Sequence, residues 1–377
     1  MSRATGKGRS RTLTISQIFS LLAILNGIVL FSLLLSAWQL LHDQSSNVQH
    51  GYTTIFLAVL LVIGVAISYR IVALRVVGPL ARLARQSEAI AADDQRSDDL
   101  LLVRGSDEIA RLTEAFNAVL VSQRRAIAQV EDSIRYAALL QKSILPDRQL
   151  QERFGEEHFV LWQPRDTVGG DYYVFHDDGP RCLAGVADCA GHGVPGAMMT
   201  MLARAGIDRS IQQVGIASPA AVLQATHAGM NQVLSEAQIS RAIATSMDVG
   251  LVFLDFNQRI MRFAGAKISL YWSDGRRVDQ AQGNSRSLWD RRSGTYQDHQ
   301  VPLLKGFTYY LATDGVFDQA GGDHGFGFGT ERFRAWLLAH AAKPLSVQHQ
   351  AFGRSLRDFM GNRPQRDDIT MLSFRLG

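Results

Sequence analysis

The chain is organised around residues 185–200, which read GVADCAGHGVPGAMMT. The apolar run that leads into this stretch is typical of a β-strand, and it ends at Asp188 in a glycine-rich turn. Pro195 follows at the start of a predicted helix, where a missing backbone N–H costs nothing. The pattern predicts a carboxylate at a strand end, beside backbone that can approach a metal ion or a phosphate closely. Taken alone, the segment is equally compatible with an Asp that stabilises a tight turn.

Three more acidic turns share this arrangement. Asp171 ends VGGD, Asp314 ends FTYYLATD, and Asp367 with Asp368 precedes ITMLSFRL. Each turn adjoins a stretch rich in β-branched or aromatic residues, so folding could gather several strand ends in one place. Carboxylates without His or Cys partners favour Mg²⁺ or Mn²⁺ over zinc. Unpaired carboxylates repel one another, and a bound cation would make such a cluster tolerable.

The order and spacing of VGGDYY, ADCAGHGVPGA, ATDGVFD and RDDIT resemble the PPM-type metal-dependent serine/threonine phosphatases, in particular their bacterial SpoIIE- and RsbU-like branch. The resemblance covers residues 159–377, within a phosphatase domain predicted at 155–377. It implies an α+β fold in which a β-sandwich is flanked by helices (α/β/β/α). The residue patterns agree with strand hairpins at 172–188 and 247–266 and with several long helices. The predicted helices are 195–213, 219–236, 330–341 and 346–360.

The resemblance also implies a ligand set for two Mn²⁺ or Mg²⁺ ions. Asp188 would bridge both ions, with the backbone carbonyl of Cys189 beside it. Asp171 would bind one ion, and Asp314 and Asp367 would bind the other. Asp368 stands where many relatives have Asn, and its expected role is secondary.

Such a centre supports hydrolysis of a phosphomonoester. Two close cations lower the pKa of a bridging water and neutralise charge on the phosphoryl oxygens, so no phosphoenzyme is required. His192 could protonate the leaving serine oxygen, because an imidazole titrates near neutral pH. It stands four residues after Asp188, not two as in the eukaryotic branch, so a hydrogen-bonding His on the turn is the alternative.

Three other segments allow two interpretations each. GGDYY at 169–173 is similar to the GGDEF signature of diguanylate cyclases, but it lacks the acidic fourth residue and would leave the other Asp turns unexplained. Lys267, in AGAKISLYW, stands where relatives carry an AGH-type turn; it is either a phosphate contact or an ordinary solvated lysine. The glycine-rich run 321–329 lacks the Lys and Ser/Thr of a phosphate-binding loop. It is either a flap near Asp314 or an inert surface loop.

The N-terminal region predicts two transmembrane helices, at 15–41 and 53–77. Both segments are apolar and long enough to cross a bilayer at ~1.5 Å per residue. Basic residues precede the first segment, in the tail 1–14, and follow the second, while the loop 42–52 has no Lys or Arg. The positive-inside rule therefore predicts that both termini are cytoplasmic. Together with the resemblance to the bacterial branch, this implies a multi-pass protein of the bacterial inner membrane with a cytoplasmic catalytic domain. A signal peptide would be shorter, and a buried hairpin in a soluble protein is the alternative.

Residues 78–125 resemble a HAMP linker. Two amphipathic stretches, 79–92 and 107–123, flank a polar connector with an apolar patch at 100–103. A HAMP module is a parallel coiled coil of two chains, so the resemblance implies a homodimer; a plain linker hairpin is the alternative. The helical pattern continues through a linker, 126–150, and stops at Pro146. We expect this helix to transmit HAMP rearrangements to the metal site.

The resemblance implies a membrane-anchored phosphatase for a regulatory phosphoprotein, of which a STAS-domain anti-sigma antagonist is one example. A weaker likeness, at 318–329, is to SiaA-type biofilm phosphatases, although the large sensor domain expected there is absent. The alternative is a receptor or scaffold whose phosphatase-like domain is a non-catalytic binding module. The chain has 377 residues and a net charge of +4, partly due to the membrane flanks. Without a basic recognition helix, nucleic-acid binding is not expected.

Overall fold

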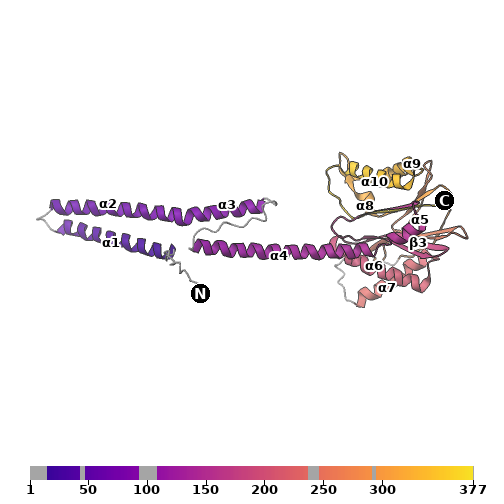
Figure 1. The fold of residues 1–377 in the computed structure, drawn as a ribbon, viewed down its shortest axis with the longest axis horizontal. Helices are drawn as coiled ribbons and strands as arrows, with labels where there is room; N and C mark the ends of the chain where they lie inside the picture. Colours follow the sequence, from indigo (N-terminus) through magenta and orange to yellow (C-terminus); the bar gives the residue numbers. More distant parts are fainter. Residues whose placement is uncertain (1–14, 43–46, 93–107, 237–245, 291–293, 377) are drawn as a thin grey trace, which may run out of the picture. The chain divides into compact units, whose positions relative to one another are not determined.

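The computed structural model describes residues 15–42, 47–92, 108–236, 246–290 and 294–376 (Figure 1). The basic tail 1–14 and the apolar patch 100–103 lie outside these residues. The chain forms two compact units, Met1–Val130 and Glu131–Gly377. Each unit is described by itself below.

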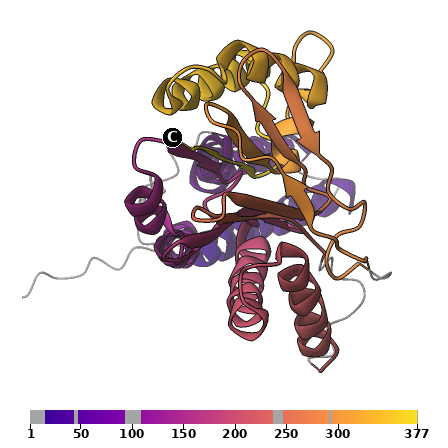
Figure 2. The same ribbon diagram turned by 90° about the vertical axis from the view of Figure 1, so that its right-hand side faces the viewer.

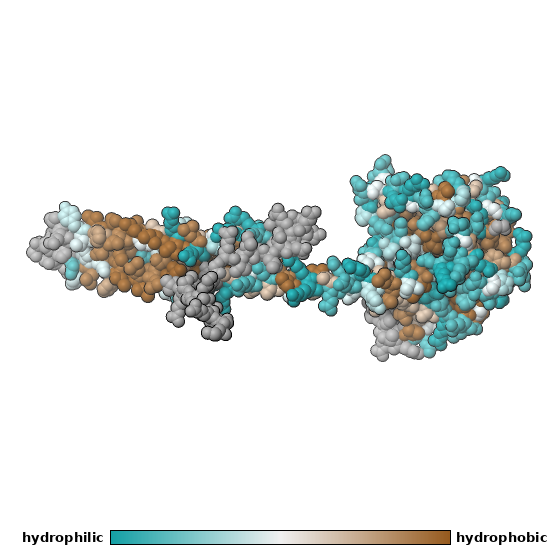
Figure 3. Space-filling model, in the orientation of Figure 1, coloured by the Kyte–Doolittle hydropathy of each residue, from teal (hydrophilic) through white to brown (hydrophobic). Residues whose placement is uncertain are grey.

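The first unit contains a helical hairpin of α1 (Ile15–His42) and α2 (Asn47–Val72). Asn26 Nδ2 donates to Ser68 Oγ at 2.8 Å, so polar side chains join the two helices within an otherwise apolar pair. Two stretches, Ile15–Gln39 and Gly51–Glu88, are long and apolar enough to cross a membrane by length and composition. Figure 3 shows the hydrophobic surface that these helices present.

A short π-helix, η1 (Ala73–Val77), joins α2 to α3 (Gly78–Ala92), and the sequence patterns did not predict it. Pro79 explains it, because a proline inside a helix lacks an N–H and its ring clashes with the carbonyl four residues earlier. A wider π turn relieves this clash, and Gly78 N bonds Ala73 O across it. The next described residue, Glu108, begins α4 (Glu108–Ser143), which is one helix of 36 residues.

Within its described residues, the second unit is built on two five-stranded antiparallel sheets. The first sheet has the order β2-β3-β4-β5-β8: Asp171–Asp178, Arg181–Cys189, Met247–Asp255, Ile260–Ala266 and His299–Val301. The second has the order β1-β12-β9-β6-β7: His158–Gln163, Ile369–Arg375, Thr308–Ala312, Leu270–Ser273 and Val278–Ala281. The predicted hairpins are β2–β3 and β4–β5.

Helices cover both outer faces of the sandwich (Figures 1 and 2). The pair α6 (Gly193–Val214) and α7 (Pro219–Glu236) packs on the first sheet, and α9 (Gly329–His340) and α10 (Leu345–Met360) pack on the second. The predicted α/β/β/α architecture is therefore confirmed. Short helices α5 (Asp147–Phe154) and α8 (Asp314–Asp318) complete the unit, and the glycine-rich run forms a small hairpin, β10 (Ala320–Gly321) with β11 (Phe326–Gly327).

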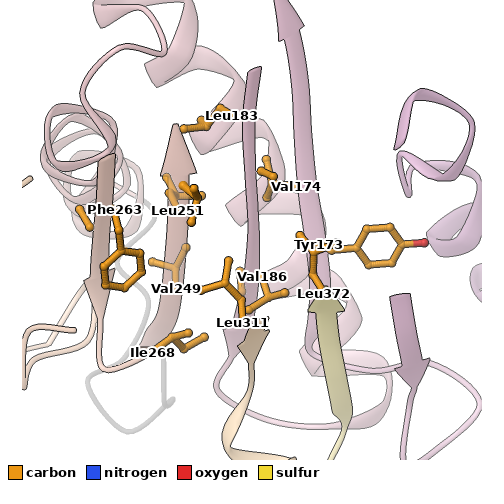
Figure 4. Packing of buried hydrophobic residues seen from close by; sticks show 14 of the residues in the cluster. Tyr173, Val174, Leu183, Val186, Val249, Leu251, Phe263, Ile268, Leu311 and Leu372 are labelled. Atoms are coloured by element: carbon orange, nitrogen blue, oxygen red, sulfur yellow. The ribbon is translucent and has the colours of Figure 1, made fainter. Parts of the chain in front are cut away.

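The main core fills the space between the two sheets (Figure 4). Val186 of the first sheet meets Leu311 and Leu372 of the second, and all three are fully buried. Tyr173 lies on the same face of the sheet as its strand partner Val186, and its ring extends to α5, where its hydroxyl donates to the Asp147 carboxylate. Burial on both faces explains why the central strands are nearly continuous apolar runs.

Candidate active site

One row of charged side chains crosses the end of the first sheet. Asp171 of β2 pairs with Asp188 of β3, and Asp188 pairs with Asp248 of β4. Directly paired residues of antiparallel strands place their side chains on the same face, about 5 Å apart. The next position in the row belongs to Lys267, one residue beyond β5, whose Nζ lies 3.3 Å from Asp248 Oδ2. Three carboxylates and one ammonium group therefore stand side by side.

Asp171 is a buried carboxyl group with only part of its hydrogen-bonding capacity used. Thr313 Oγ1, one residue beyond β9, donates to Asp171 Oδ2 at 2.7 Å, while Asp171 Oδ1 is buried without a partner. Burial raises the pKa of Asp171 to about 8, and the charges of Asp368 and Asp314 add to this. The metal-free site therefore disfavours the ionised form that a cation would require.

Asp188 and Asp314 also meet at this end of the sandwich. Burial raises the pKa of Asp188, and the neighbouring charges of Asp171 and Asp314 raise it further. Burial likewise raises the pKa of Asp314, which begins α8 and whose side chain forms a hydrogen bond with that of Asp188. The exposed Asp367 lies close enough to Asp314 to raise the same pKa. The structure thus brings together the four Asp residues that the sequence singled out.

Asp368 has a positional role that the sequence did not reveal. Its Oδ1 accepts from the backbone N–H of Arg165, and its Oδ2 accepts from that of Gly170, each at 2.6 Å. This buried carboxylate therefore fixes the loop that leads into β2. A Cβ added to Gly169 would lie 2.6 Å from Asp368 Oδ1, so the close approach requires glycine there.

The turn after β3 is held against the same loop. A Cβ at Gly170 would lie 2.4 Å from the carbonyl oxygen of Cys189 and 2.6 Å from that of Gly191. Cys189 N donates to Gly170 O at 3.2 Å, and Thr200 Oγ1 donates to the same oxygen at 2.8 Å. Burial raises the pKa of the Cys189 thiol, so its backbone carbonyl is the better candidate for a metal ligand.

His192 immediately precedes α6, with its side chain half exposed. Its Nδ1 lies 2.9 Å from Asp166 Oδ2 and 2.7 Å from Arg165 Nη2. Both partners belong to the loop between β1 and β2. The structure therefore places the imidazole against this loop, and its role as a general acid stays a prediction.

Two residues at the site were missed by sequence reasoning. Gln141, near the end of α4, is fully buried; its Nε2 donates to Gly169 O at 2.6 Å and its Oε1 accepts from Gly169 N at 3.2 Å. No local pattern marks this residue, because its partner is 28 positions away. Asp248 could have been found, since it adjoins a buried strand just as Asp171 does.

The donor set fits a hard divalent cation. Oxygen donors predominate, like charges stand together, and the buried Asp171 Oδ1 lacks a partner. Among the residues that the structure describes, however, no three acidic, imidazole or thiol groups already form a ligand cage. The assignment of individual ligands therefore remains a prediction.

Comparisons with known proteins match both parts of the chain. The family profile "Stage II sporulation protein E (SpoIIE)" matches residues 178–377, and that of the HAMP domain matches 71–124. The structure of the SiaA-PP2C domain of Pseudomonas aeruginosa is 53% identical, with a TM-score of 0.63, over 67% of this chain and 99% of that one. A SpoIIE fragment from Bacillus subtilis is 15% identical, with a TM-score of 0.47, over 58% of this chain and 61% of that one.

No sequence among the curated proteins matches the chain. The SpoIIE profile covers more than half of the 377 residues, and the SiaA-PP2C structure is matched over nearly its whole length. The chain therefore belongs to the SpoIIE group of PPM-type serine/threonine protein phosphatases and carries a HAMP domain ahead of its phosphatase domain.

Proposed function

We propose that this enzyme removes phosphate from a serine or threonine of a regulatory phosphoprotein, using two Mn²⁺ or Mg²⁺ ions. The observation that carries the proposal is the gathering of carboxylates from both sheets, with burial and mutual repulsion raising their pKa values. A hard divalent cation is the natural counter-charge for such a group. The proposed ligands are Asp171, Asp188, Asp314, Asp367 and the carbonyl of Cys189.

The chain's own residues would position the phosphoryl group and a proton. Bound ions supply an activated water and neutralise phosphoryl charge. Asp188 stands between Asp171 and Asp248 in the sheet and reaches Asp314, which makes it the natural bridging ligand. Asp166 engages Nδ1 of His192, so Nε2 is the atom that we expect to protonate the leaving oxygen.

The N-terminal unit would anchor the enzyme in the bacterial inner membrane. Two helical stretches of sufficient length and apolarity support this, as does the HAMP match that follows them. The charge distribution favours a cytoplasmic phosphatase domain. We further propose a homodimer, because a HAMP module pairs two chains and α4 exposes Leu112, Val119 and Val130 along its length. A STAS-domain phosphoprotein is the proposed substrate class by family resemblance.

The proposal is tested with the full-length protein in detergent and a generic aryl phosphate. We expect Mn²⁺-dependent phosphate release that falls by more than about 100-fold in Asp188→Asn and Asp314→Asn, which exceeds the usual effect of losing an outer-shell partner. Asp358→Asn, at an exposed position of α10, is the matched control and should keep its activity. A wild-type protein that binds two Mn²⁺ ions yet hydrolyses neither the aryl phosphate nor phosphoproteins would instead support a binding module.

A further inference from the structure

The row of carboxylates ends in a lysine. Lys267 Nζ lies 3.3 Å from Asp248 Oδ2, and the two side chains differ in exposure, 51% for Lys267 and 15% for Asp248. Asp248 in turn lies close enough to Asp188 and Asp314 for its charge to raise the pKa of each. The ammonium group is therefore separated from the proposed metal ligands by one carboxylate, yet it remains open to solvent.

The backbone holds Lys267 in this position at some strain. Its φ is 61°, in the left-handed region that side chains with a Cβ rarely adopt. Lys267 N donates to Asn284 O at 2.6 Å, and Ile268 N donates to Ala266 O at 2.8 Å, so the turn is fixed on both sides. A glycine or an asparagine would adopt this turn more easily. A left-handed residue beside a reaction centre raises the question of what its side chain contributes there.

Arg165, another cation near the site, has different partners. The Arg165 guanidinium donates to the carbonyl of Arg366 at 3.3 Å and contacts His192 and Asp166. The Arg165 guanidinium is therefore engaged with His192 and with the loop between β1 and β2. Lys267, in contrast, pairs with a member of the carboxylate row itself.

We propose that Lys267 binds the phosphoryl oxygens of the substrate and that Asp248 is a positioning residue for its ammonium group. This proposal rests on the proposed phosphatase function. An ammonium group has three donors, and its contact with Asp248 requires only one of them. Charge-assisted hydrogen bonds to phosphate are among the stronger polar interactions in proteins. The half-exposed side chain gives the ammonium group access to an incoming phosphate.

The test measures binding of inorganic phosphate, by calorimetric titration of the full-length protein at saturating Mn²⁺. Lys267→Met removes the charge at nearly constant length, Lys267→Arg keeps a cation, and Lys305→Met removes an exposed lysine from a loop as the matched control. We expect Lys267→Met to weaken phosphate binding by about tenfold, the effect of losing one charged hydrogen bond. Lys267→Arg should recover part of this loss, and Lys305→Met should match the wild type.

Kinetics separate binding from a structural effect. Lys267→Met should raise KM for an aryl phosphate and the inhibition constant for phosphate by similar factors, with kcat and Mn²⁺ stoichiometry little changed. Asp248→Asn should weaken phosphate binding less, and the double variant should be no weaker than Lys267→Met alone, because both changes act on one interaction.

Two results would overturn the proposal. Unchanged phosphate affinity in Lys267→Met would remove the proposed role of the lysine. Loss of a Mn²⁺ ion in Asp248→Asn would make Asp248 a metal ligand, not a positioning residue. The titration needs no turnover, so it decides the role of Lys267 even if the wild type releases no phosphate, which would count against the proposed function alone.

Discussion

The side-chain amide of Gln141 pairs with both backbone polar groups of Gly169, two residues before Asp171. Gln141 is fully buried and lies near the end of α4, whose first half falls within the HAMP match at 71–124. A single continuous helix therefore runs from the HAMP region to the turn that presents a proposed metal ligand. This arrangement gives the hypothesis of signal transmission through the linker helix a specific contact.

Replacing Gln141 should weaken metal binding. Gln141→Leu leaves the buried N–H of Gly169 unpaired and leaves its C=O with only the 3.3 Å contact from Thr200 Oγ1. A buried unpaired group costs about 1–3 kcal/mol. We expect the Mn²⁺ concentration for half-maximal phosphate release to rise, together with some loss of stability against urea. Lys142→Leu, at the exposed neighbouring position, is the control and should behave as the wild type. A normal Mn²⁺ dependence in Gln141→Leu would show that the contact does not position the site.

Changing the helical phase of α4 should alter activity in the full-length protein. One residue inserted after Gln129 rotates the two ends of the helix by about 100° relative to each other. Seven inserted residues change the phase by only about 20°, so this variant is the matched control. We expect phosphate release to change with the single insertion and to stay close to the wild type with seven. Equal rates in all three proteins would contradict transmission through the helix.

The central strands could be predicted from the sequence because both of their faces are buried. β3 and β4 read as apolar runs bounded by turns, and the structure places them in the middle of the first sheet. The prediction missed β1, β7 and β8, which are all edge strands. The side chains of β7 and β8 are partly exposed and lack a continuous apolar run. β1 carries the short apolar run 159–162, which the prediction overlooked.

The site could be predicted in part for a similar reason. The proposed carboxylate ligands adjoin strand ends, a property that one-dimensional patterns reveal. The contacts that position those strand ends leave no such local pattern in the sequence. Asp368 bonds Gly170 across 198 residues, and Gln141 bonds Gly169 across 28. Such pairs depend on how the two sheets and α4 pack together. No spacing rule in the sequence encodes that packing.

Gly170 should tolerate no side chain. Gly170→Ala would place a Cβ 2.4 Å from the carbonyl oxygen of Cys189, so the turn after β3 must shift. We expect loss of phosphate release and a lower free energy of unfolding. Gly229→Ala is the matched control, because Gly229 lies in α7 with nothing within 4 Å of the added Cβ. That substitution should stabilise the protein by up to about 1 kcal/mol in urea unfolding, as alanine favours helix. If Gly170→Ala and Gly229→Ala changed activity and stability equally, a clash with the Cys189 carbonyl would not explain the need for glycine at 170.

Removing the charge of Asp171 should stabilise the metal-free protein while abolishing activity. Asp171→Asn keeps an acceptor for the Thr313 hydroxyl and removes a carboxyl group whose pKa burial raises to about 8. Between the ordinary pKa of 3.8 and about 8, the unfolded chain is ionised while the folded protein keeps the proton, so this group destabilises the fold more as pH rises through that range. We therefore expect a gain of about 1 kcal/mol in EDTA at pH 8 and less at pH 6. Urea unfolding with EDTA and with Mn²⁺ measures this. A variant that gains as much from Mn²⁺ as the wild type would exclude Asp171 as a ligand.

His227 should make the phosphatase domain sensitive to mild acid. Its buried Nδ1 accepts from the backbone N–H of Trp289 at 3.1 Å, and burial lowers its pKa below the usual 6.5. Protonation would place a second N–H against that donor. Between the two pKa values the unfolded chain binds more protons, so this contribution is intact above about pH 6.5 and is lost as pH falls through the lower folded value. We expect His227→Gln to be less stable than the wild type at pH 7.5 but to lose less stability between pH 7.5 and 5.5, as measured by urea unfolding. Equal pH dependence in both proteins would mean that other groups cause the acid sensitivity.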